Sequence, residues 1–155
     1  MVTAALRTEL TVDRRVFSGW SIAVPIGMEE AFIADDGYWH AWSEGRTISL
    51  SSIVLTDRRG DAVPARKILA KTPPMEGEET AVPNDLPGWA RSIERPDVSP
   101  GARAISGILV VDGNVLLATV SSEDPDWNRS VWRSIRHQPG AATRLRRRHA
   151  KRRRR

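Results

Sequence analysis

A predicted β-hairpin within residues 102–121 constrains the fold more than any other part of this sequence. Asp112 and Gly113 suit a two-residue turn in which both central residues take positive φ angles. The flanking apolar runs are almost continuous and rich in β-branched residues, as is typical of strands covered on both faces. These runs contain Ile105, Ile108, Leu109, Val110, Val111, Val115, Leu116, Leu117 and Val120. We therefore expect strands at residues 102–111 and 114–121, in the centre of a sheet.

The residues that follow predict a helix over 126–137. Its start carries residues that cap helices or favour their first turn, namely Ser122, Asp124 and Pro125. One apolar stripe recurs every four residues and consists of Trp127, Val131 and Ile135. We expect the stripe to pack on the sheet that contains the hairpin. His137 would lie at the helix C-terminus, where a cation interacts favourably with the helix dipole.

Shorter patterns predict the rest of the domain. Strands are expected at residues 21–25, 31–34, 38–42, 47–56 and 89–95, and a short helix at 64–71. Consecutive hairpins of this kind indicate an α+β fold. The expected architecture is one antiparallel β-sheet of about six to eight strands, with the short middle helix and the C-terminal amphipathic helix packed on it.

Composition changes divide the chain into three parts. Residues 1–12 have weak periodicity and predict an N-terminal arm or a short first strand, and residues 13–140 predict a single α+β domain. Residues 141–155 predict a disordered Arg-rich tail. Within the domain, residues 72–88 form a Pro-rich acidic loop, and loops of that length are usually functional or mobile.

Two short phrases resemble the PsbP-like family. They are Gly19-Trp20-Ser21-Ile22-Ala23-Val24-Pro25 near the start and Trp132-Arg133-Ser134-Ile135-Arg136 near the end. The resemblance covers roughly residues 17–137. The family includes photosystem extrinsic subunits and a nuclear-transport GTPase-binding protein. It implies a scaffold for protein–protein contact without a shared catalytic motif, so it assigns no functional residue here.

The net charge of +5 hides two opposite charge distributions. Residues 1–143 hold 15 basic and 19 acidic residues, a net of −4. All nine other basic residues lie in the tail: Arg144, Arg146, Arg147, Arg148, Lys151, Arg152, Arg153, Arg154 and Arg155. Such a run favours non-specific, salt-dependent contact with nucleic acid or another polyanion. The alternative is a solvated tail, or one that folds back on the acidic loop.

An aromatic strand supplies the candidate protein-binding residues. In the sequence Tyr38-Trp39-His40-Ala41-Trp42, alternation places Tyr38, His40 and Trp42 on one face and Trp39 with Ala41 on the other. Tyr and Trp are frequent in interface hot spots, so the first three are candidates for binding a protein. We expect Trp39 and Ala41 to belong to the core.

Catalytic and metal-binding patterns are weak. The chain has no Cys, and His40 and His137 are the histidines of the domain. No Gly-x-Ser-x-Gly elbow accompanies them, so a small hydrolase with His40 as base is a minor alternative. The acidic clusters lack metal-ligand spacing and no Gly-rich phosphate loop is present, so we expect neither metal nor cofactor.

These observations favour a non-catalytic interaction domain that binds another protein through its sheet or its acidic loop. The alternative is a nucleic-acid-associated protein recruited by its Arg-rich tail. No segment approaches the length of a membrane span, and the first residues lack a signal-peptide pattern, so we expect a cytoplasmic protein. Arg outnumbers Lys by 21 to 3, which is typical of a high-GC bacterial genome.

Overall fold

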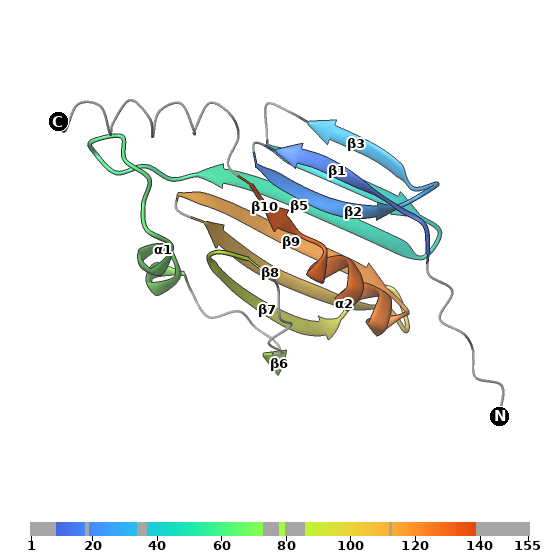
Figure 1. Cartoon of the computed structure of the whole chain (residues 1–155). Helices are drawn as coiled ribbons and strands as arrows, with labels where there is room; N and C mark the ends of the chain where they lie inside the picture. The colour runs from blue at the N-terminus through green and yellow to red at the C-terminus, as the bar shows by residue number, and fades with distance from the viewer. Residues whose placement is uncertain are drawn as a thin grey trace.

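The computed structural model describes residues 9–17, 19–33, 37–72, 78–79, 86–111 and 113–138. Ten strands and two helices are formed within these residues (Figure 1). The strands before the middle helix are β1 (Thr11–Phe17), β2 (Trp20–Pro25), β3 (Glu29–Ile33), β4 (Tyr38–Ser43) and β5 (Arg46–Val54). After them come α1 (Ala65–Lys71), β6 (Glu78–Glu79), β7 (Trp89–Pro96), β8 (Arg103–Val111), β9 (Asn114–Ser122), α2 (Pro125–Arg133) and β10 (Arg136–His137).

The described strands form two antiparallel sheets. The large sheet has seven strands in the order β3-β4-β5-β9-β8-β7-β6, and the small sheet has three in the order β1-β2-β10. The predicted α+β class is therefore confirmed, but the prediction of one sheet is wrong for the described residues. The division falls after β2, where Pro25 cannot donate a ladder hydrogen bond and Gly27 takes a φ of +94°.

The predicted central hairpin is confirmed. β8 and β9 pair along their whole length, with Val111 opposite Asn114 beside the turn. β5 flanks the hairpin on one side and β7 on the other. Gly113 has a φ of +79°, a conformation that glycine adopts without a Cβ clash. The other strands that were predicted differ from their expected ranges mainly at their ends.

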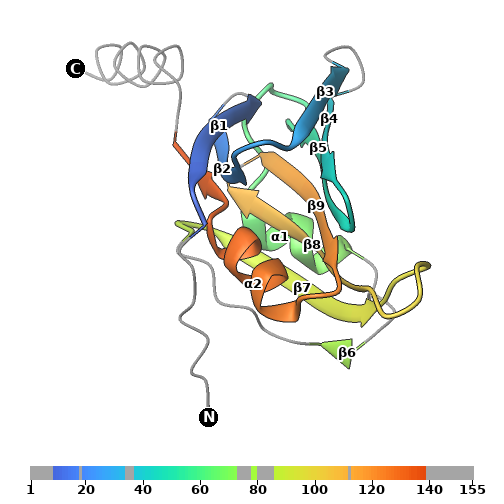
Figure 2. The same cartoon turned by 90° about the vertical axis from the view of Figure 1, so that its right-hand side faces the viewer.

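One face of the large sheet is covered by α2 and the small sheet (Figure 2). Trp20 from β2 and Trp132 from α2 are fully buried in this core with Leu109 and Leu116 from the hairpin. Gly107 lets Trp132 approach the sheet closely, because a Cβ at residue 107 would lie 2.6 Å from the Cη2 atom of Trp132.

The opposite face is only partly covered. Helix α1 packs three buried side chains, Ala65, Ile68 and Leu69, on this face. They contact Ile108 and Val110 of β8 and Val115 of β9. Farther along β9, on the same face, Leu117 is 43% exposed. The hairpin is thus covered on both faces at one end and on one face at the other.

The two sheet edges at β1 and β3 lie close together. The Arg14 guanidinium contacts the Glu30 carboxylate at 3.2 Å, and the Phe17 and Phe32 rings have centroids 5.6 Å apart. Figure 1 shows β1 and β3 side by side at the same border of the molecule. Charged side chains at such edges discourage pairing with strands of other chains.

The predicted helix over 126–137 is wrong at its C-terminal end. The Ser134 hydroxyl donates to the carbonyl of Val131 at 2.6 Å and accepts the backbone N–H of Ala23 at 3.1 Å. These bonds end the helix and tie it to β2. The chain then extends as β10, in which Arg136 pairs with Ser21 and His137 with Trp20.

His137 therefore lies beyond the end of α2. The prediction that it lies at the helix C-terminus and interacts with the helix dipole is wrong. The His137 ring is buried against the Trp20 indole with a centroid separation of 4.6 Å. No hydrogen-bond partner of its Nδ1 atom is found among the described residues. Burial lowers the pKa of His137 below its ordinary value because the charged imidazolium loses its hydration.

Several sequence predictions fall at the limits of the described residues. β1 begins at Thr11, within the range expected as an arm or a short first strand. In the acidic loop, β6 pairs with β7 through Glu78 opposite Glu94, while residues 73–77 and 80–85 lie outside the described residues. The Arg-rich tail, residues 141–155, also lies outside them.

The first prediction compares two tryptophans. Trp132→Ala should lower the free energy of unfolding by about 3–5 kcal/mol, because it empties a fully buried site. Trp89→Ala is the matched control. Trp89 is 59% exposed, so its replacement should lower the free energy of unfolding far less. Urea denaturation of both variants measures the difference. Equal losses would show that the core is not centred on Trp132.

The second prediction concerns pH. A histidine whose pKa is lowered by folding binds fewer protons in the folded state than in the unfolded state. Stability should therefore fall as pH drops below about 6.5, and stop falling below the folded pKa. Urea denaturation at about pH 7.5 and pH 5 should show a smaller loss for His137→Gln than for the wild type. The same pH dependence in both proteins would contradict this assignment.

Candidate functional site

The predicted protein-binding residues form a row on the open face of the large sheet. Tyr38, His40 and Trp42 are each half-buried, whereas Trp39 and Ala41 are in the core as predicted. The rings of Tyr38 and His40 stack with centroids 6.1 Å apart and an angle of 15°. Those of His40 and Trp42 stack at 5.1 Å and 22°. We call these three side chains the ring row.

A hydrogen-bond network on β5 fixes the ring row. The Nδ1 atom of His40 lies 3.0 Å from the Ser49 hydroxyl, and the Tyr38 hydroxyl donates to the same oxygen at 3.4 Å. Ser49 lies directly opposite His40 in the β4–β5 register. One serine thereby orients two rings, which reduces the side-chain freedom that would be lost on binding.

A shallow hollow of about 350 Å³ lies beside the ring row. Its lining is rich in hydroxyl groups, from Tyr38, Ser49, Ser51, Ser106 and Thr119. Leu117 adds an apolar side chain and Arg95 a guanidinium group. The Ser106 hydroxyl connects two strands, because it receives a hydrogen bond from Arg95 at 3.4 Å and lies 3.2 Å from the Thr119 hydroxyl.

An acidic group lies on the segment after Arg95. The carboxylate of Asp97 accepts hydrogen bonds from the hydroxyl of Ser121 and the backbone N–H of Val98. The pKa of Asp97 is lowered mainly by the Ser121 hydrogen bond and then by the Val98 N–H, since both favour the charged carboxylate. Asp97 is therefore a stable negative charge beside the cation of Arg95.

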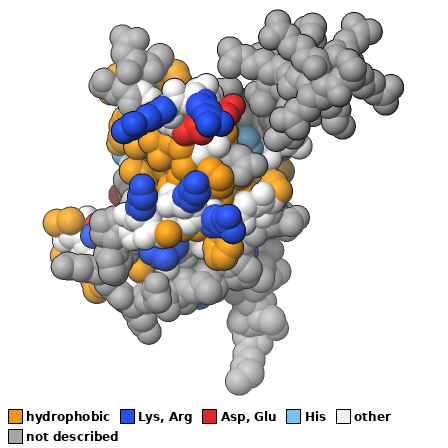
Figure 3. All heavy atoms as spheres, turned by 90° about the vertical axis from the view of Figure 1, so that its left-hand side faces the viewer, with side chains coloured by type: hydrophobic (Ala, Val, Ile, Leu, Met, Phe, Trp, Pro, Cys, Tyr) orange, Lys and Arg blue, Asp and Glu red, His pale blue; other side chains and the backbone are white. Residues whose placement is uncertain are grey.

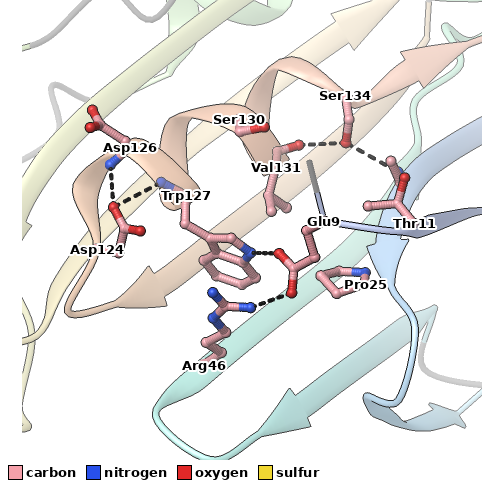
Figure 4. A pocket seen from close by; sticks show the side chains of 11 residues that line it. Glu9, Thr11, Pro25, Arg46, Asp124, Asp126, Trp127, Ser130, Val131 and Ser134 are labelled. Carbon is pink, nitrogen blue, oxygen red and sulfur yellow. Dashed lines mark hydrogen bonds and ion pairs between the residues drawn. The ribbon is translucent and has the colours of Figure 1, made fainter. Parts of the chain in front are cut away.

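A second candidate site is a groove of about 460 Å³ along α2, shown in Figure 4. The Glu9 carboxylate receives two hydrogen bonds here, from Arg46 at 2.6 Å and from the Trp127 indole N–H at 3.0 Å. The Arg46 guanidinium also lies over the Trp127 ring, 4.6 Å from its centroid. Arg46 and Trp127 together form what we call the carboxylate clamp.

The start of α2 positions Trp127. The Asp124 side chain accepts the backbone N–H groups of Asp126 at 3.0 Å and Trp127 at 3.2 Å, an N-cap that agrees with the sequence pattern. Asn128, which is buried, bonds the Ser122 hydroxyl at 2.7 Å and donates to the carbonyl of Arg103 at 2.9 Å. These bonds fix the first turn of α2 on the end of the central hairpin.

Sequence reasoning did not find the carboxylate clamp. Glu9 lies 37 residues from Arg46 and 118 from Trp127 in the sequence. No local spacing relates residues so far apart, and each was assigned another role or none.

Among the described residues, neither His40 nor His137 is part of a Ser–His–Asp hydrogen-bond arrangement. The His40 ring forms a hydrogen bond with the Ser49 hydroxyl, and no described carboxylate bonds to this ring. His137 is buried against Trp20. Among the residues that the structure describes, no group of three or more His, Cys, Asp or Glu side chains could hold a metal ion. None of the described helices is long and apolar enough to span a membrane.

The predicted nucleic-acid-binding residues, from Arg144 to Arg155, lie outside the described residues. The domain itself has a basic surface near α1. Its exposed cations are Arg58, Arg59, Arg66, Lys67 and Lys71, and the exposed carboxylates of Asp57 and Asp61 lie in the same loop as Arg58 and Arg59. Figure 3 faces the side of the molecule on which α1 lies in Figure 1, and shows Lys and Arg side chains around hydrophobic surface.

Comparison with known proteins supports the fold alone. No family model matches the chain, and no curated protein matches its sequence. Among solved structures, a protein of Bacteroides thetaiotaomicron VPI-5482 is similar over 83% of this chain, with a TM-score of 0.53 and 10% identity. The similarity covers 49% of that protein, so this chain spans about half its length. At this identity, the similarity concerns the arrangement of strands and helices.

Proposed function

We propose that this chain is a non-catalytic protein-binding domain of PsbP-like type that acts in the cytoplasm. The antiparallel large sheet supports the PsbP-like assignment, as does α2, which follows the last long strand and buries Trp127, Val131 and Trp132 on the sheet. Its partner binds the open face of the large sheet. The ring row is the observation that carries this proposal.

The ring row has the physical properties of a binding anchor. Aromatic side chains bring a large contact area with few rotatable bonds, and so lose little conformational entropy when they bind. Tyr38, His40 and Trp42 are already stacked, and Ser49 holds the first two of these rings. Each of the three is only half-buried, so part of every ring is available for contact.

The adjacent hollow defines what the partner offers. Its serine and threonine hydroxyls accept and donate hydrogen bonds, and Arg95 attracts a carbonyl or carboxylate oxygen. Apolar contact is available from Leu117 and from Ile53, which is exposed on β5. A polypeptide segment with one apolar side chain, placed between the ring row and Leu117, matches this mixed surface. We propose such a segment as the ligand.

The third prediction tests the ring row. Trp42→Ala should weaken binding of the partner by about tenfold or more, since truncating a central interface aromatic typically costs ~2 kcal/mol. The intact chain is used to capture partners from the cells that express it, and the affinity of the purified partner is then measured by calorimetry.

Phe32→Ala is the matched control for this experiment. Phe32 is an exposed aromatic on β3, but its ring contacts Phe17 and not the ring row. Binding should survive this substitution. If Trp42→Ala binds as tightly as the wild type, the open face is not the interface.

The second candidate function is association with nucleic acid. The tail carries nine basic residues, and the surface near α1 adds the exposed cations Arg66, Lys67 and Lys71. This arrangement favours contact with phosphates without base recognition, because the basic residues of the tail have no aromatic side chains between them.

The fourth prediction measures salt dependence. Deleting residues 144–155 should reduce the slope of log affinity against log salt by several units, as each phosphate contact contributes about 0.9. Lys67→Ala should reduce it by about one. Arg133→Ala is the control and should leave the slope unchanged, because Arg133 is an exposed cation on α2 and not on the surface near α1. A slope that is unchanged by the deletion would exclude the tail from binding. Fluorescence anisotropy with a short labelled duplex provides the measurement.

A further inference from the structure

We propose that the carboxylate clamp is a binding site for an acidic side chain of a partner polypeptide, and that Glu9 occupies it in the free protein. This site is separate from the ring row and does not depend on the function proposed above. Arg46 and Trp127 belong to β5 and α2, whereas Glu9 lies before β1. A site made by two fixed elements thus holds a group from the start of the described chain.

The donors of the clamp converge on one carboxylate. Arg46 and the Trp127 indole bond different oxygens of Glu9, at 2.6 and 3.0 Å. Trp127 is buried, its backbone is fixed by the Asp124 cap, and its ring supports the Arg46 guanidinium from below. The donors are therefore placed by the fold, and a carboxylate is the chemical group that satisfies both of them.

Glu9 is placed to exchange with another carboxylate. Its side chain is 40% exposed and that of Arg46 is 33% exposed, so water reaches the ion pair. An ion pair in such a position contributes little net stability, which makes replacement by an equivalent group easy. Departure of Glu9 leaves the two donors in place, ready for another carboxylate.

The groove beside the clamp accommodates the chain that would carry the acidic side chain. Thr11, Ser130 and Ser134 line it with hydroxyl groups, and Val131 and Pro25 line it with apolar surface (Figure 4). Asp124 and Asp126 line it as well. Their charges disfavour a second acidic residue. The ligand is accordingly a segment with one Glu or Asp and otherwise uncharged or basic residues.

The fifth prediction uses the sequence of residues 8–12, Thr-Glu-Leu-Thr-Val, as the probe peptide with an amidated C-terminus. It should bind the full chain carrying Glu9→Ala about two- to sixfold more tightly than the wild type, because a weakly held internal competitor is gone. The NMR signal of the Trp127 indole N–H should shift during the titration. Its assignment comes from its absence in Trp127→Phe.

Three controls separate this proposal from its alternatives. Arg46→Met, added to Glu9→Ala, should abolish the binding. Glu44→Ala removes another exposed carboxylate near Arg46 and should leave the weak binding of the wild type unchanged. The amidated peptide with Gln in place of Glu should not bind.

The outcomes are decisive because folding is monitored in the same spectra. Tighter binding of the Glu peptide to Glu9→Ala, with a shift of the Trp127 signal, supports the proposal. Equal binding to Glu9→Ala and the wild type would overturn it, as would equal binding of the Glu peptide and its amidated Gln counterpart. Binding that leaves the Trp127 signal unmoved would also overturn it.

Discussion

The close packing of α2 on the central hairpin is the contact on which the rest of this structure depends. Trp132 lies over Gly107, where a larger residue would collide with the indole ring. Ile135 and Trp20 are buried in the same core, so this contact also joins the small sheet to the large one. The packing of α2 on the hairpin also fixes the first turn of the helix. Trp127 is therefore held where it can contact Glu9 and Arg46.

The parts of the fold that were predictable are those encoded by neighbouring residues. The Asp112-Gly113 turn and the apolar runs beside it indicated the hairpin, and Asp124 with Pro125 indicated the start of α2. The end of the helix was not predictable from local pattern, because Ile135 continues the apolar stripe. Ser134 ends α2 through bonds that include the N–H of Ala23, 111 residues earlier in the sequence.

The same distinction applies to the candidate sites. Strand alternation was sufficient to place Tyr38, His40 and Trp42 on one face, since that depends only on the period of a β-strand. It could not show that Ser49 orients two of the rings, which depends on the register between β4 and β5. The carboxylate clamp depends on the fold of the whole domain, and it had no signal in the sequence.

The small sheet also determines the order in which the domain can fold during synthesis. Its central strand, β2, pairs with β1 from the first described residues and with β10 from the last. Until the chain has emerged as far as His137, the buried side chains Trp20 and Ile22 lack α2 and β10 as cover. Contacts between such distant segments form slowly, because a long loop must close first. The N-terminal hairpin therefore lacks part of its apolar cover until the final described elements of the domain have formed.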